Sequence, residues 1–108
     1  MDATQVMHAL EYYVPAEVPS WPPCVLIHGA ARGADEGAAR WAKSEGIASR
    51  AYPANWRKHG KAAGPIRNQQ MLDDGRPDFV VAFPGGRGTA DMVRRAHAAG
   101  VPVYEVSP

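Results

Sequence analysis

Two glycine-rich stretches, HGAARGAD (28–35) and FPGGRGTADM (83–92), hold the residue types best suited to binding an anion. Glycine has no Cβ, so a phosphate or similar oxyanion can approach the backbone N–H groups of such loops closely. Neither stretch has the G-x-G-x-x-G dinucleotide pattern or the Lys-Ser/Thr pair of a Walker A loop. Taken alone, either loop is better explained as a tight turn. The candidate ligand-binding residues here are His28, Gly29, Arg32, Gly33, Asp35, Gly85, Gly86, Arg87, Gly88 and Thr89.

The segment GPIRNQQML (64–72) adds two polar candidates at the start of an expected helix. At 100° per residue, Arg67 and Asn68 fall on the same side as Met71 and Leu72. Two polar residues therefore interrupt an apolar face, and Arg67 is a suitable donor to phosphate or carboxylate. The competing interpretation is an arginine on the surface.

A basic segment surrounds this helix start. From Gly46 to Leu72 the chain has no Asp or Glu, and Trp56 and Lys61 lie among its basic residues. Such a segment suits an electropositive rim, with Trp56 stacked on a nucleobase. The alternative is a solvated loop that Trp56 anchors to the core, and for Trp56 the two interpretations are balanced.

The remaining polar side chains are weaker candidates. Asp35 either caps the helix that follows it or accepts a hydrogen bond from a ribose hydroxyl, and capping is favoured. His28, His59 and His97 lack metal-ligand spacing, and Cys24 is the single cysteine. We therefore expect no metal site, no bound cofactor and no internal disulfide.

Hydrophobic periodicity divides the chain into alternating helices and strands. Thr89 is expected to cap the last helix, and Gly46 and Gly100 to end helices. Prolines make 15–23 a connector, and 54–64 is expected to be a loop. The expected helices span 3–14, 35–45, 64–74 and 89–99, and the expected strands span 24–28, 47–53, 78–83 and 101–106.

This alternation predicts an α/β fold, a Rossmann-like three-layer sandwich with a mostly parallel sheet of about four strands. In such sheets ligands bind outside the carboxyl ends of the strands. Both glycine loops directly follow expected strands, so they lie at the same edge of the sheet. Two loops at one edge favour anion binding over two unrelated turns.

The bulk composition indicates one soluble domain over residues 1–108. Twelve basic residues against eleven acidic ones argue against a nucleic-acid-binding protein, which usually has a basic excess. No run is long enough to span a membrane. The N-terminal stretch lacks the basic and apolar regions of a signal peptide, so we expect a cytoplasmic protein.

Three motifs, HGAARGAD (28–35), YPANWRKHGKAAGPIRNQQML (52–72) and FPGGRGTADMVRRA (83–96), resemble the YspA-type, YpsA-related branch of the SLOG superfamily. SLOG domains are Rossmann-like and are related to DprA and to the Lonely-guy (LOG) phosphoribohydrolases. The resemblance covers roughly residues 24–106. It implies a domain that binds nucleotides or nucleotide-derived small molecules, and it supplies no confirmed reaction.

The sequence departs from the LOG pattern P-G-G-x-G-T-x-x-E at the catalytic glutamate, where it has Met92. Asp91 is one residue early, and a helix turns 100° per residue, so its carboxylate should point elsewhere. A thioether cannot transfer a proton or stabilise developing positive charge as a carboxylate does. We therefore expect no catalytic residue in this loop.

A second departure concerns the first strand of related domains, which usually precedes the first helix and is central in the sheet. This sequence begins at the expected helix. Either the sheet closes around four strands or another protomer covers the gap, and the latter favours a homo-oligomer.

The leading hypothesis is therefore non-catalytic binding of a nucleotide-like small molecule, such as ADP-ribose, NAD or a cyclic or monophosphate derivative. The chain would then act in sensing or sequestering its ligand. One alternative is a LOG-like N-glycosidic hydrolase that uses a displaced carboxylate, which would be Asp91, Asp35 or another. A second is a DprA-like, DNA-associated interaction module.

Overall fold

The structure is a computed structural model that describes residues 5–11, 25–29 and 34–106. Residues 5–11 are helical, within the helix expected at 3–14. The strands are β1 (Val25–His28), β2 (Ala48–Ala51), β3 (Val80–Ala82) and β4 (Val103–Glu105). The helices are α2 (Ala34–Ser44), α3 (Trp56–His59), the 3₁₀ helix η1 (Gly60–Ala62), α4 (Ala63–Gly75) and α5 (Arg87–Ala98). The connector expected at 15–23 and Cys24 lie outside the described residues.

The four strands form two separate parallel pairs. β1 pairs with β2, with Val25 opposite Ala48, and β3 pairs with β4, with Val80 opposite Val103. The parallel pairing and the α/β class follow the sequence prediction, but the continuous four-stranded sheet was wrong. Within the described residues, no backbone ladder joins β1 to β3. The strands are only three or four residues long, so each pair has few ladder hydrogen bonds and depends on its helices.

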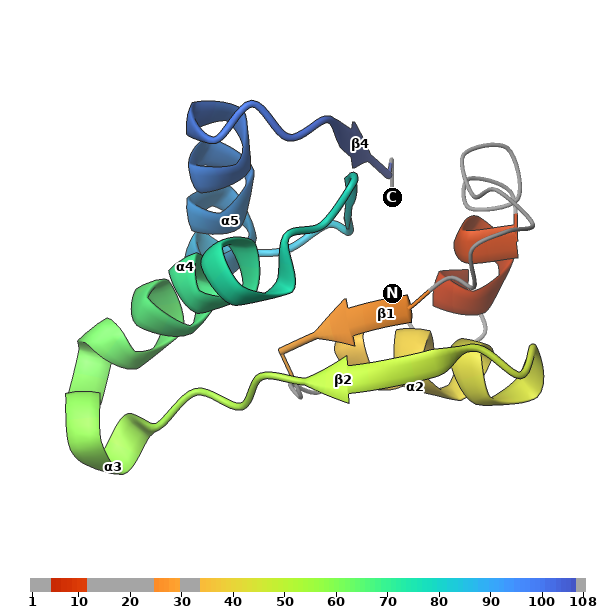
Figure 1. The fold of residues 1–108 in the computed structure, drawn as a ribbon, viewed down its shortest axis with the longest axis horizontal. Helices are drawn as coiled ribbons and strands as arrows, with labels where there is room; N and C mark the ends of the chain where they lie inside the picture. The colour runs from red at the N-terminus through yellow and green to blue at the C-terminus, as the bar shows by residue number, and fades with distance from the viewer. Residues whose placement is uncertain (1–4, 12–24, 30–33, 107–108) are drawn as a thin grey trace.

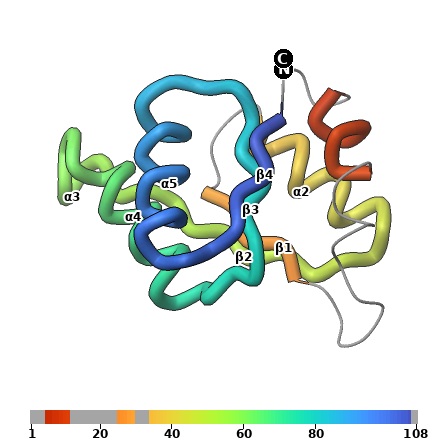
Figure 2. The backbone as a smooth tube through the Cα atoms, turned by 90° about the horizontal axis from the view of Figure 1, so that it is seen from above, coloured from red at the N-terminus to blue at the C-terminus, as the bar shows by residue number. Residues whose placement is uncertain are grey.

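The helices attach to the strand pairs unequally. α2 packs on β1 and β2, whereas α4 packs mainly on α5, which in turn contacts β3 and β4 (Figure 1). Seen from above, the β3–β4 pair lies between α5 on one side and α2 with helix 5–11 on the other (Figure 2). α3 and η1 form a projection at the end of the molecule away from helix 5–11. The space between the strand pairs is thus bordered by helices on both sides.

The buried core lies where helix 5–11 meets α2. Its fully or nearly buried members are Val6, Leu10, Ala38, Trp41 and Ala42. Partly buried side chains from both strand pairs pack against this cluster, namely Leu26, Val81 and Phe83. The shared core therefore holds the two strand pairs together in place of a continuous ladder.

Trp41 is 4% exposed, and its indole Nε1 has no hydrogen-bond partner among the described residues. A buried donor without a partner costs about 1–3 kcal/mol. Trp41→Phe removes that donor but leaves a small cavity, and the two effects oppose each other. We expect the free energy of unfolding in urea to stay within about 1 kcal/mol of wild type. A loss of about 3 kcal/mol or more would contradict this balance between the two effects.

Two local predictions were wrong. The loop expected at 54–64 is mostly helical, because the Asn55 side chain accepts a hydrogen bond from Lys58 N at 3.1 Å and caps α3. The cap of α5 is Gly86 and not Thr89, which lies in the first helical turn. The helix begins at Arg87, two residues before Thr89, and no side chain caps it. The glycines expected after α2 and α5, Gly46 and Gly100, do adopt positive φ angles of 69° and 74°.

Among the described residues, we find no helix with the length and apolarity that crossing a membrane requires.

Candidate ligand-binding site

A large cavity, of about 1040 Å³, lies between the two strand pairs. Apolar side chains of β1 and β3 line it, including Leu26, Ile27, Val80 and Val81. At the carboxyl ends of β1 and β3 the lining becomes polar. A volume near 1000 Å³ is at the upper end of small-molecule sites and has room for a nucleotide.

Arg67 connects α4 to the carboxyl ends of both β1 and β2. Its Nη1 donates to Gly29 O at 2.6 Å and to Tyr52 O at 3.4 Å. A Cβ on Gly29 would overlap the guanidinium group, so this approach requires glycine. Nη2 makes none of the hydrogen bonds found among the described residues. The guanidinium therefore lines the cavity with donors left for an anion.

Asn68 is 4% exposed and uses both ends of its side-chain amide. Nδ2 donates to Gly88 O at 3.2 Å and to Asp91 Oδ2 at 3.0 Å. Oδ1 accepts from Arg67 Nε at 3.0 Å. Asn68 therefore joins the first turn of α5 to the arginine that holds the loop after β1.

Asp91 is buried beside this amide and serves the contact between α4 and α5. Its carboxylate accepts from Arg94 Nη2 and Arg95 Nε, both at 2.8 Å, as well as from Asn68. Burial by itself raises the pKa of Asp91. Hydrogen bonds from Arg95 and Asn68, and the charges of Arg95 and Arg94, outweigh burial and hold that pKa below its usual value. Asp91 is thus ionised, and it is not part of the cavity lining.

Met92 lines the cavity that Asp91 does not reach. The one-residue offset between them turns their side chains to different sides of α5. The position that corresponds to the LOG glutamate is therefore directed at the cavity and carries a thioether.

The loop before α5 is shaped by its glycines. A Cβ on Gly85 would overlap the Thr89 hydroxyl, so glycine allows the loop to pass close to the helix. A Cβ on Gly88 would meet no atom within 4 Å, and Gly88 lines the cavity. The N–H groups of the first turn of a helix have no partners within the helix, and Gly88 and Thr89 of this turn line the cavity.

The structure brings most of the residues predicted from the sequence around this one cavity. Those lining it are His28, Gly29, Asp35, Arg67, Asn68, Gly85, Gly88 and Thr89. Gly86 and Arg87, at the start of α5, are not part of its lining. Arg32 and Gly33 lie outside the described residues.

Trp56 and Lys61 are not brought to the cavity. Trp56 is 60% exposed on α3, and its ring edge lies near Gly64 at the start of α4. The interpretation of Trp56 as a buried core anchor is therefore wrong. In this structure Trp56 does not line the cavity either, as a residue that stacks on a bound base would. The short helices α3 and η1 carry both residues away from the strand ends (Figure 1).

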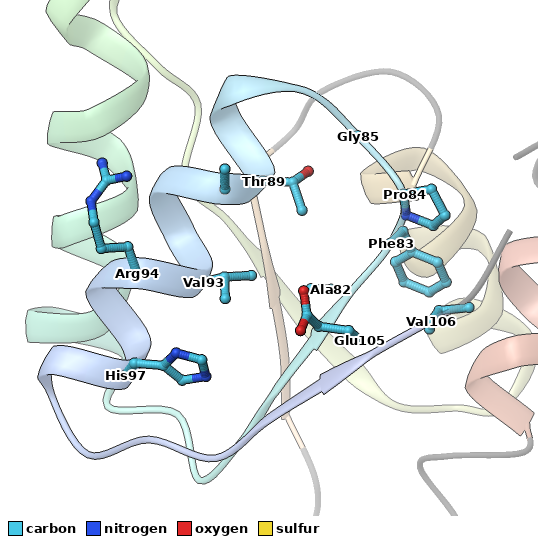
Figure 3. Close-up of a pocket in the computed structure, with 11 residues that line it drawn as sticks. Ala82, Phe83, Pro84, Gly85, Thr89, Val93, Arg94, His97, Glu105 and Val106 are labelled. Atoms are coloured by element: carbon cyan, nitrogen blue, oxygen red, sulfur yellow. The ribbon is translucent and has the colours of Figure 1, made fainter.

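A smaller cavity, of about 520 Å³, lies on the other side of the 83–85 loop, between α5 and the β3–β4 pair. The Glu105 carboxylate and the His97 ring point into it, whereas Arg94 points toward α4 (Figure 3). Among the described residues, only the loop after β3 reaches this cavity, whereas the loops after β1 and β3 both line the larger one. The larger cavity is therefore the better anion site.

Two residues outside the candidate set also matter for this site, one as part of the lining and one as support for Arg67. Arg50, which belongs to the basic segment but was not among the candidate ligand-binding residues, lines the larger cavity from β2. Tyr52 supplies a carbonyl to Arg67, and its hydroxyl bonds Asp74 at 2.5 Å. That bond, together with burial, raises the pKa of Tyr52. The stretch without acidic residues was a usable signal for Arg50, but no local pattern identified Tyr52.

The sequence model of the YspA, cpYpsA-related SLOG family matches residues 4–59, which is more than half of the chain. The chain belongs to this family. The matched part includes β1, α2, β2 and α3 and ends before the 83–92 stretch.

A similar protein is the Gene 61 protein of Mycobacterium phage D29. It is 45% identical over an 86-residue alignment that covers 73% of this chain and 68% of the phage protein. No solved structure matches the chain significantly. Membership of this SLOG family suggests a nucleotide-related function.

Proposed function

We propose that the cavity between the strand pairs binds a nucleotide-like ligand, with its phosphate between Arg67 and the first turn of α5. The observation that supports this most is the convergence of two distant glycine loops on one cavity. Gly29 follows β1, Gly85 and Gly88 follow β3, and all three line the same space.

The two ends of the cavity suit the two parts of such a ligand. At the polar end, unpaired N–H groups, the positive end of the helix dipole and the Arg67 charge all favour a phosphate. The other end is lined by the side chains of β1 and β3, by Phe79 and Met71, and by the charged Arg76 and Asp78 just before β3, which suits a flat base with polar edges. AMP, NAD and ADP-ribose all combine these two properties.

We further propose that the ligand is bound without being hydrolysed. The cavity has Met92 where a LOG enzyme needs a carboxylate, and Asp91 is occupied by two arginines and Asn68. This supports sensing or sequestering over catalysis.

Titration calorimetry with AMP, NAD, ADP-ribose and adenosine tests the binding proposal. We expect at least one phosphate-bearing ligand to bind, and added inorganic phosphate to lower its apparent affinity. Adenosine should bind less tightly than AMP. Absence of binding across the panel at millimolar concentration would contradict the proposal.

Gly88→Val is expected to weaken AMP binding at least about tenfold, because its side chain enters the cavity where the phosphate approaches the backbone. The fold should persist, since valine is a better helix residue than glycine. Gly86→Ala is the matched control: its Cβ also meets open space, but Gly86 does not line the cavity. Equal affinities for wild type and Gly88→Val, with native circular dichroism, would mean that the loop is only a turn.

Incubation of the wild-type protein with AMP is expected to leave the nucleotide intact, as measured by chromatographic detection of adenine. Positioned acid–base catalysis is typically worth about 10²–10⁴-fold in rate, and a thioether supplies none of it. Adenine release above background would instead support the N-glycosidic hydrolase, with Asp35 as the carboxylate in the cavity lining.

A further inference from the structure

We propose that Asn68 is the positioning residue of this site, and that it couples the two glycine loops so that one phosphate is held by both. The inference rests on the binding function proposed above. The role that it assigns to Asn68 does not require Asn68 to contact the ligand. Asn68 would act by fixing the distance between Arg67 and the first turn of α5.

The first half of the coupling is the bond from Asn68 Nδ2 to Gly88 O, at 3.2 Å. Gly88 lies in the turn whose N–H groups would receive the phosphate. α4 and α5 come from separate parts of the chain, so the position of this turn relative to α4 depends on contacts such as this one. The same Nδ2 also donates to Asp91 Oδ2, which anchors the amide in one orientation.

The second half is the bond from Arg67 Nε to Asn68 Oδ1, at 3.0 Å. It uses one edge of the guanidinium and fixes its plane, while Nη1 is held by Gly29 O at 2.6 Å. The chain of contacts therefore runs from the loop after β1, through Arg67 and Asn68, to the loop after β3. Preorganised donors bind an anion more tightly because less conformational freedom is lost on binding.

A neighbouring contact separates this role from ordinary helix packing. Gln69 Oε1 accepts from Arg95 Nη1 at 3.0 Å, so it also joins α4 to α5. Among the described residues, Gln69 makes no hydrogen bond to either glycine loop, and it does not line the cavity. Loss of Gln69 therefore weakens the helix pair without disturbing the proposed coupling.

A double-mutant cycle on the full chain, with AMP as the probe, tests the inference. We expect Asn68→Ala to weaken AMP binding about tenfold, and Gln69→Ala to change it less than about threefold. Asn68 is proposed to act through Arg67, so its loss should matter little once Arg67 is replaced. The double variant Asn68→Ala/Arg67→Gln should therefore bind AMP less than about threefold more weakly than Arg67→Gln alone. A purely structural effect would be additive, and an additive cycle or an equal loss in Gln69→Ala would overturn the inference.

Asn68→Asp gives a second measurement, should the alanine variant fold poorly. It keeps the acceptor for Arg67 but places a carboxylate about 3 Å from that of Asp91. Two carboxylates so close share a proton as the pH falls, which replaces their repulsion by a hydrogen bond between position 68 and Asp91 of α5. The ratio of variant to wild-type AMP affinity should therefore rise between pH 7.5 and pH 5. The ratio removes the titration of AMP itself, and a ratio independent of pH would overturn the inference.

Failure of the two proposals can be told apart. If wild type binds no member of the nucleotide panel, the binding function itself fails. If wild type binds AMP but the Asn68 variants match it, the binding function stands and only the coupling by Asn68 is wrong.

Discussion

Asp91→Ala is expected to lower the free energy of unfolding by about 3 kcal/mol, the largest stability loss we foresee for a polar residue here. Asp91 is 7% exposed and accepts hydrogen bonds from Asn68 and from two arginines. Its removal leaves the buried Asn68 Nδ2 with one partner fewer and Arg95, 32% exposed, without its carboxylate. Urea denaturation followed by circular dichroism measures the loss.

Arg94→Ala is the matched control for this variant. Arg94 also bonds Asp91, but its side chain is 71% exposed, and solvent-exposed ion pairs contribute about 0–1 kcal/mol. We expect Arg94→Ala to stay within that range. Equal losses in the two variants would mean that burial of Asp91 does not determine its contribution.

The pH dependence of stability carries a separate signature of Asp91. Its pKa is lower in the folded protein than in the unfolded chain, where an Asp has a pKa of about 3.9. Its contribution to stability is therefore complete above the unfolded pKa and is lost as the pH falls through the folded pKa. Compared with wild type, Asp91→Ala should lose less stability between about pH 5 and pH 2. An identical acid dependence would show that other carboxylates cause the acid sensitivity.

Arg67→Gln is expected to weaken AMP binding about 100-fold, because it removes a charged donor for which a neutral amide substitutes poorly. The loss has two sources, the charge near the phosphate and the support that Nη1 gives to the loop at Gly29. Calorimetry with AMP measures it, and adenosine, which has no phosphate, should be affected less.

The control for Arg67→Gln is Arg94→Gln, which removes an equal charge from a side chain outside the larger cavity. We expect AMP affinity to change by less than about threefold, which is the scale of screened long-range charge effects. Arg67→Lys should recover only part of the affinity, since lysine restores the charge but not the planar fork. Unchanged AMP binding in Arg67→Gln would place the phosphate elsewhere in the cavity.

The sequence by itself determined the local elements of this protein and their order. The apolar runs ending at His28 and Phe83 predicted β1 and β3, and Gly46 and Gly100 marked the ends of α2 and α5. These signals are local, because side-chain periodicity and positive φ depend on neighbouring residues. Alternation of strands with helices then predicted parallel pairing, which both strand pairs show.

Only the tertiary structure decided how these elements are combined. It separated the strands into two pairs with a cavity between them, placed Trp56 on a projecting helix, and joined Arg67 to Gly29 across 38 residues. It also enclosed Asp91 among Asn68, Arg94 and Arg95, contacts that depend on how α4 meets α5. Such contacts join residues distant in sequence, and their geometry follows from packing, which no local pattern records.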